Sequence, residues 1–163
     1  MTDHTREHLI ELLRRFDTAM LVTRSAEGEL RSRPMMIVER DLEGCLWLAT
    51  SLDSPKVHEI EQDPRVNLAL QAERSFISIE GTASVVRDHA AVDAMWKTSW
   101  RVWFPKGGSD PDLGLLRVTM EVAEYWDLGG ANGIRFLLDA ARSYLKNAPP
   151  APSGDLHGKV YGA

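Results

Sequence analysis

Short apolar runs alternate with polar, glycine-bearing turns along most of the chain, a pattern typical of antiparallel strands. Such runs span residues 19–23, 30–38, 45–50, 66–70, 76–86 and 115–126. β-branched and small residues alternate in the fifth run, and Gly81 within it indicates a bend or bulge. Six strands with short helices between them favour a barrel or a strongly curled sheet over a parallel α/β fold.

Two helices are predicted in the first half of the chain. Apolar residues recur at helical spacing among charges over residues 5–16, which indicates an amphipathic helix. Ser54 followed by Pro55 is a strong helix start, because serine caps helices well and proline fits the first helical position. Pro64 is expected to end this second helix.

The second half of the chain is predicted to hold two more helices. Asp88 is expected to cap a helix that continues to Phe104, where Pro105 stops it. A closing helix is expected over 134–145. We assign residues 1–146 to one domain and residues 147–163 to a Pro/Gly-rich tail without regular structure.

Composition narrows the class of protein further. The chain has 163 residues, 44% of them apolar, which suits a single domain with a substantial core. Its formal charge is −5 and it has no cluster of Lys and Arg, so a nucleic-acid partner held through its phosphate backbone is not expected. One small phosphorylated ligand remains compatible with this charge.

Cysteine use and hydropathy indicate a cytoplasmic protein. Cys45 is the only cysteine, so neither an intramolecular disulfide nor a cysteine-based zinc site is expected. The five histidines form no convincing set of metal ligands, and no bound metal is expected. The N-terminus is charged and no segment approaches the roughly 20 apolar residues of a membrane span, so no membrane partner is expected.

The stretch from Thr50 to Lys56 is the most informative for function. A strand ending in Thr50 and Ser51 leads directly into the helix start at Ser54 and Pro55. Free N–H groups and the helix dipole favour an anion at such a start, and Lys56 in the first turn fits the same anion. The sequence therefore predicts a phosphate site here.

The preceding strand supplies guanidinium groups to the same region. Arg31 and Arg33 are two residues apart, so they share one face of the sheet, and a guanidinium grips phosphate in a bidentate fashion. A single surface Arg or Lys is usually only solvated. Together with the hydroxyl groups of residues 50–54, however, these arginines favour a binding role.

Seven fragments in order resemble a known family over roughly residues 5–130. They are Ser32-Arg33-Pro34-Met35, Leu46-Trp47-Leu48-Ala49-Thr50, Ser54-Pro55-Lys56, Asp63-Pro64-Arg65-Val66, Ile79-Glu80-Gly81-Thr82-Ala83, Trp103-Phe104-Pro105-Lys106-Gly107 and Glu124-Tyr125-Trp126-Asp127. With these fragments the chain resembles the flavin-binding split barrels related to pyridoxamine 5′-phosphate oxidase, in particular their general stress proteins. The resemblance implies a mainly β, six-stranded antiparallel Greek-key split barrel with short flanking helices.

The resemblance also implies a flavin mononucleotide (FMN) site, in a cleft between the two subunits of a homodimer. Arg33 and Lys56 would hold the phosphate, the backbone near Ala49 would lie against the ring, and Gln71 would reach the ring from the partner chain. The full expected set is Arg33, Pro34, Met35, Met36, Ala49, Thr50, Ser51, Ser54, Pro55, Lys56, Gln71 and Trp103. The dinucleotide flavin (FAD) is left open as a second cofactor.

The aromatic residues Trp96, Trp100, Trp103 and Phe104 allow two interpretations. Their helical spacing is typical of core packing or of a dimer seam, which is the favoured interpretation because large aromatics are usually buried. Alternatively, Trp103 or Phe104 walls the flavin ring. Trp126 invites the same two interpretations, and packing is favoured there too.

Three functions are considered. The first is a flavin-dependent oxidoreductase that passes electrons between a reductant and a small acceptor. Because the cofactor carries the chemistry, such a protein needs few acids or bases of its own. This is compatible with the sequence, in which no catalytic triad is recognisable. The second is a flavin-binding stress module without turnover. The third, pyridoxamine 5′-phosphate oxidase itself, is disfavoured because the expected Trp, Arg and His pattern does not follow Trp126.

Overall fold

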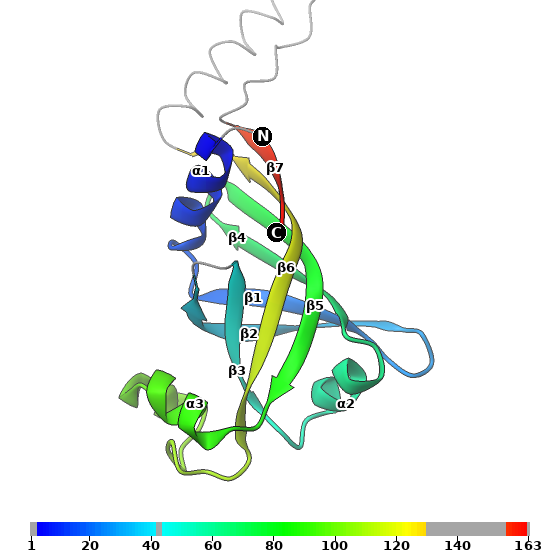
Figure 1. Cartoon of the computed structure of the whole chain (residues 1–163), viewed down its shortest axis with the longest axis vertical. Coiled ribbons are helices and arrows are strands. Elements are labelled where there is room, and N and C mark those ends of the chain that lie inside the picture. The colour runs from blue at the N-terminus through cyan, green and yellow to red at the C-terminus, as the bar shows by residue number, and fades with distance from the viewer. Residues whose placement is uncertain (1–2, 42–43, 130–155, 163) are drawn as a thin grey trace, which may run out of the picture.

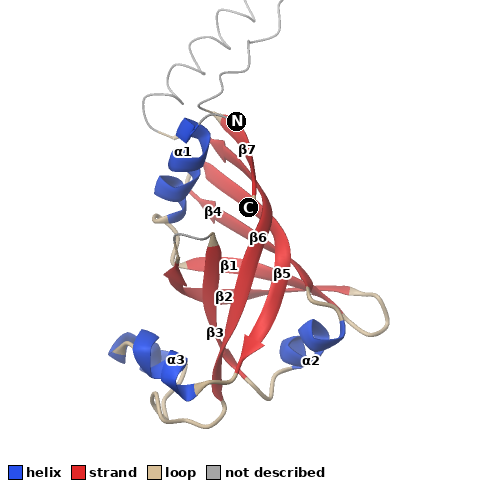
Figure 2. Cartoon of the chain, viewed as in Figure 1, coloured by secondary structure: helices blue, strands red, loops and turns tan. Residues whose placement is uncertain are grey.

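The computed structural model describes residues 3–41, 44–129 and 156–162 (Figure 1). The elements in chain order are α1 (Asp3–Leu13), β1 (Thr18–Arg24), β2 (Leu30–Arg40), β3 (Cys45–Ser51), α2 (Pro55–Gln62), β4 (Arg65–Ala72), β5 (Ser75–Val86), α3 (His89–Met95), the 3₁₀ helix η1 (Thr98–Val102), β6 (Leu113–Asp127) and β7 (His157–Tyr161). Strands therefore dominate, as the sequence pattern predicts (Figure 2).

The six strands β1 to β6 form a closed antiparallel barrel. Their order is β3-β2-β1-β4-β5-β6, and an additional pairing between β3 and β6 closes the ring. β7 pairs with the outer edge of β6. The predicted six-stranded split barrel is confirmed, and the seventh strand lies outside it.

Alternation of side chains along the strands builds the barrel interior. In β1, Ala19, Leu21 and Thr23 are buried, whereas their neighbours are exposed or partly exposed. The β5–β6 register shifts between Glu80 and Gly81, which confirms the predicted bulge. A Cβ atom at Gly81 would lie 2.0 Å from the Thr119 carbonyl oxygen, so glycine is needed for this close approach.

The helices cover the ends of the barrel. α1 lies at the end near β7, and α2 and α3 lie toward the opposite end (Figure 1). α2 begins at Pro55 and ends before Pro64, as predicted, and buries Val57 and Ile60 in the main core. A second apolar cluster, centred on Trp100, joins α3 and η1 to the barrel wall.

The third predicted helix differs from the structure. A continuous helix was expected from Asp88 to Phe104, but α3 ends at Met95 and Lys97 is extended before η1 begins. Trp96 and Trp100 pack edge to face, with ring centroids 5.4 Å apart. Because Trp100 is fully buried, the requirements of tertiary packing prevail over helical periodicity here.

The C-terminal region also departs from expectation in part. β7 lies within residues 147–163, a segment predicted to lack regular structure. The sequence does not indicate this strand, because its pairing partner β6 is distant in sequence. The predicted helix over 134–145 lies outside the described residues, and the division at residue 146 stays a prediction. No helix in the described ranges is long and apolar enough to cross a membrane.

Candidate functional site

One open hollow beside β2 and β3 gathers most of the predicted site. Its volume is about 1080 Å³, including the part open to solvent, which is ample for a small-molecule ligand. The residues that line it, here called the main hollow, are Asp17, Thr18, Arg33, Pro34, Met35, Met36, Ala49, Thr50, Ser51, Lys56, Trp103 and Phe104. They come from β1 and the residue before it, β2, β3, α2 and the two residues that follow η1.

Nine of the twelve predicted site residues line the main hollow; the exceptions are Ser54, Pro55 and Gln71. Ser54 precedes α2, but its hydroxyl donates to the Ser51 carbonyl at 2.6 Å and caps no helical amide. Gln71 lies in another hollow with Met20, Phe76 and Trp126. Thr18 lines both hollows, so the two adjoin.

The turn between β3 and α2 is held in place by Asp112, which precedes β6. The carboxylate of Asp112 accepts from the Ser51 hydroxyl at 2.5 Å and from the Asp53 amide at 2.9 Å, while its carbonyl accepts from the Leu52 amide at 2.7 Å. The Ser51 hydroxyl lowers the pKa of Asp112. These bonds fix the entry to α2, and with it the position of Lys56.

Lys56 is half-buried at the second position of α2 and faces the main hollow. Burial, followed by the nearby charge of Arg33, lowers the pKa of its amine, and the carboxylates of Asp112 and Glu59 only partly offset this. Within the part of the chain that the structure describes, Lys56 makes no ion pair. An anion in the hollow would therefore relieve an unfavourable charge.

Arg33 is anchored on its inner side by a buried carboxylate. One terminal nitrogen of Arg33 donates to Glu59 Oε2 at 2.9 Å, and the other donates to the Thr23 hydroxyl. Glu59 and Thr23 are both buried. A guanidinium has further N–H donors, so Arg33 can also hold a ligand in the hollow that it lines.

Arg31 serves a different role from the one expected. It shares a face with Arg33, as predicted, since both reach Glu59, but it is absent from the lining of the main hollow. Its guanidinium donates to Glu59 at 3.1 Å and to the exposed Glu29 at 3.3 Å. Arg31 therefore neutralises carboxylates beside the hollow.

Some of the aromatic residues pack in the core, and others line the main hollow. Trp96 and Trp100 pack in the second cluster, as the favoured interpretation predicts. Trp103 is 71% exposed and lines the main hollow with Phe104, so it presents a flat apolar surface at the mouth of the site. Trp126 stacks on His157, with ring centroids 5.4 Å apart.

Sequence reasoning missed Glu59, Thr23 and Asp112. Glu59 lies three residues after Lys56, a spacing that places both on neighbouring faces of one helix, but the sequence does not show that the helix turns Glu59 toward β1. Asp112 meets Ser51 across 61 positions of sequence. No local pattern signals such a contact.

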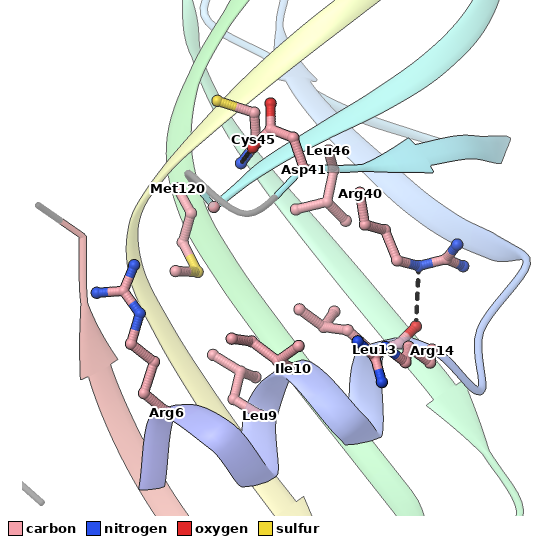
Figure 3. Close-up of a pocket in the computed structure, with 11 residues that line it drawn as sticks. Arg6, Leu9, Ile10, Leu13, Arg14, Arg40, Asp41, Cys45, Leu46 and Met120 are labelled. Carbon is pink, nitrogen blue, oxygen red and sulfur yellow. Dashed lines mark hydrogen bonds between the residues drawn. The ribbon is translucent and has the colours of Figure 1, made fainter. Parts of the chain in front are cut away.

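A separate hollow of about 610 Å³, including the part open to solvent, lies between α1 and the barrel (Figure 3). Leu9, Ile10 and Leu13 of α1 face Leu46 and Met120 across it. Three arginines also line this α1 hollow: Arg6, Arg14 and Arg40. Arg40 is tied to α1, since its Nε donates to the Leu13 carbonyl at 3.0 Å. None of the predicted site residues lines the α1 hollow.

Comparison with known proteins identifies the family to which this barrel belongs. The family model described as "Pyridoxamine 5'-phosphate oxidase like" matches residues 4–150. The chain therefore belongs to the pyridoxamine 5′-phosphate oxidase-like family. This confirms the family that the sequence fragments indicate.

Within this family the chain is similar to general stress proteins. It is 30% identical to the general stress FMN/FAD binding protein of Xanthomonas citri, covering 80% of this chain and 93% of that one, with a TM-score of 0.68. It is 26% identical to general stress protein 26 of Bacillus anthracis, covering 75% and 93% of the two chains, with a TM-score of 0.67. It is also 27% identical to Protein bli-3 of Neurospora crassa, over 80% of this chain and 68% of that protein.

Proposed function

We propose that this chain binds FMN in the main hollow and works as a flavin-dependent oxidoreductase. The observation that carries the proposal is that Lys56 and Arg33, two neighbouring cations, line one hollow, and that Lys56 makes no ion pair among the described residues. A phosphomonoester dianion would complement this pair. The relative from Xanthomonas citri is described as FMN/FAD binding, which supports the same ligand class.

The rest of the hollow suits a flat, partly apolar ring system. Met35 and Met36 line it from β2, Ala49 lines it from β3, and Trp103 stands at its mouth. Thr50 and Ser51 add hydroxyl groups close to the helix start. A phosphate at Lys56 and a ring against these apolar side chains would occupy both parts of the hollow. The same ring and phosphate occur in FAD, so the test below includes both flavins.

The flavin would supply the redox chemistry by accepting and releasing electrons when bound. The residues of this chain bind it, orient it and limit access of water. Arg33 and Lys56 fix the phosphate end, and the apolar side chains of β2 and β3 shield one side of the ring. Because the flavin would carry the chemistry, the protein needs no nucleophile of its own.

The proposed active form is a homodimer with the flavin in a cleft between subunits. Val102 and Trp103 are 81% and 71% exposed beside the hollow, more than is usual for large apolar side chains. A second copy would cover them. Gln71 of the adjoining hollow would then approach the flavin ring of the partner subunit.

Flavin titration of the purified protein tests the binding proposal. Tryptophan and flavin fluorescence should show tight binding of FMN and binding of riboflavin that is weaker by about 10-fold or more, because riboflavin lacks the phosphate. Titration with FAD in parallel would measure its affinity relative to FMN. No binding of any flavin would overturn the proposed function.

A reduction assay tests the catalytic part. Under anaerobic conditions NADH or NADPH should bleach the visible flavin bands of the loaded protein, and a small acceptor should restore them. A loaded protein that neither nucleotide nor any other donor reduces would instead be a flavin-binding module without turnover.

A further inference from the structure

We propose that Glu59 is a positioning residue of the phosphate site: it orients Arg33 toward the phosphate, and the preference for FMN over riboflavin depends on it. This inference rests on the proposed function, because it concerns how the same hollow selects a phosphorylated flavin. Glu59 does not line the main hollow. By its charge alone, a carboxylate beside an anion site would weaken binding of the phosphate.

Glu59 and Thr23 together hold both terminal nitrogens of the Arg33 guanidinium. Oε2 of Glu59 accepts from the Thr23 hydroxyl at 2.6 Å and from Arg33 at 2.9 Å, and the Thr23 hydroxyl in turn accepts from the other terminal nitrogen of Arg33. Oε1 of Glu59 accepts from Arg31 at 3.1 Å. The carboxylate therefore has partners on both oxygens, and these contacts leave Arg33 little freedom to move from its place beside the hollow.

The fold makes this arrangement rigid. Glu59 is only 6% exposed, and it is flanked on α2 by Val57 and Ile60, which are buried in the barrel core. Thr23, 1% exposed, comes from the inner face of β1. Lys56 and Glu59 belong to the same helix, so packing of α2 against the barrel sets the positions of Lys56 and Arg33 together.

Glu59 keeps its charge despite its burial. Burial raises the pKa of its carboxyl group, but the Thr23 hydroxyl, Arg33 and Arg31 together outweigh this and hold the pKa below the ordinary value. The ionised carboxylate accepts hydrogen bonds only, which matches its three donors. A glutamine at this position would place an NH₂ group against at least one of those donors.

The substitution Glu59→Gln separates charge from position, because the two effects have opposite signs. Loss of a negative charge beside the hollow would by itself strengthen binding of an anion. Loss of the fixed orientation of Arg33 would weaken binding of the anion, because the contact between Arg33 and the phosphate would form less well. Riboflavin reports neither effect, since it carries no phosphate.

The test is a fluorescence titration of the full chain and its variants with FMN and with riboflavin. We expect Glu59→Gln to weaken FMN binding about 10-fold or more and to change riboflavin binding less than about twofold. The matched control is Glu61→Gln on the same helix, where Glu61 pairs with Arg87 at 2.5 Å on the exposed surface. This control should leave both affinities unchanged.

The outcomes are distinguishable. FMN affinity that is equal or higher in Glu59→Gln, or equal losses for FMN and riboflavin, would overturn the positioning role. A wild-type protein that binds FMN no better than riboflavin would instead overturn the phosphate site itself. If Glu59→Gln fails to fold, Thr23→Val keeps the carboxylate but removes the shared hydroxyl, and it should lower the FMN-to-riboflavin preference in the same direction; an unchanged preference would contradict the proposal.

Discussion

At the scale of single residues, the candidate site contains two neighbouring cations, of which one has a carboxylate partner and the other has none among the described residues. The positive charge of Arg33 meets the buried carboxylate of Glu59, whereas Lys56 is half-buried without an ion pair among the described residues. The sequence predicted both cations, because each lies in a recognisable local pattern. It did not predict Glu59, because the contact joins a helix to a strand that is distant in sequence.

Lys56→Ala and Arg33→Ala should each weaken FMN binding more than riboflavin binding. Each variant loses a charge-assisted contact to phosphate, worth roughly 1.5–3 kcal/mol, which corresponds to about a 10- to 150-fold change in affinity. Titration calorimetry with both flavins measures this difference. Equal losses for the two ligands would remove the phosphate assignment.

The affinity for FMN should also depend on pH through Lys56. Because burial and then Arg33 lower the pKa of this amine below the ordinary 10.5, the ligand-free protein loses the proton at a lower pH than an exposed lysine does. An anion favours the protonated amine, so affinity should fall as the pH rises through that lowered pKa. Affinity should also fall below about pH 6, where the phosphate gains its second proton.

Riboflavin titrations over the same pH range control for ionisation of the flavin ring. In Lys56→Met the alkaline decrease specific to FMN should disappear, while the acid decrease should remain. An alkaline decrease of equal size in Lys56→Met would show that another group causes it.

At the scale of elements, the sequence predicted those structures whose signals are local. Ser54 and Pro55 mark the start of α2, and Gly81 marks the bulge, because cap and backbone preferences act within a few residues. The sequence failed at the break between α3 and η1, where burial of Trp100 prevails over helical spacing. It also missed β7, whose formation depends on a distant partner strand.

The close backbone approach at Gly81 of β5 should be intolerant of any side chain. Gly81→Ala would place a Cβ atom 2.0 Å from the Thr119 carbonyl oxygen on the paired strand. We expect the free energy of unfolding to fall by roughly 1–3 kcal/mol in urea denaturation. The adjacent, exposed Glu80→Ala should change it by less than about 0.5 kcal/mol. Equal stability of the two variants would refute a close backbone approach at Gly81.

At the scale of the whole molecule, closure of the barrel brings the site together. The pairing of β3 with β6 places Asp112, just before β6, against the turn that begins α2. The residues that line the main hollow come from five separate parts of the chain. Local sequence patterns and the family resemblance together name most of these residues, but only the closed fold shows which of them share one hollow.

The intersubunit arrangement should show in Gln71→Ala. Gln71 lies outside the main hollow of its own chain. In the proposed homodimer it approaches the flavin ring of the partner subunit. We expect the variant to weaken FMN and riboflavin binding equally, since both carry the ring, and the loaded wild-type protein to sediment as a dimer. A flavin-loaded monomer, or a Gln71→Ala variant with unchanged affinities, would contradict the arrangement.

The most direct test of the central claim is a crystal structure of the protein with FMN. The claim is that Lys56 and Arg33 hold the phosphate of a flavin in the main hollow. The structure should show the phosphate oxygens within hydrogen-bond distance of Lys56 Nζ and the Arg33 guanidinium. A phosphate bound elsewhere, for example among the arginines of the α1 hollow in Figure 3, would contradict the account.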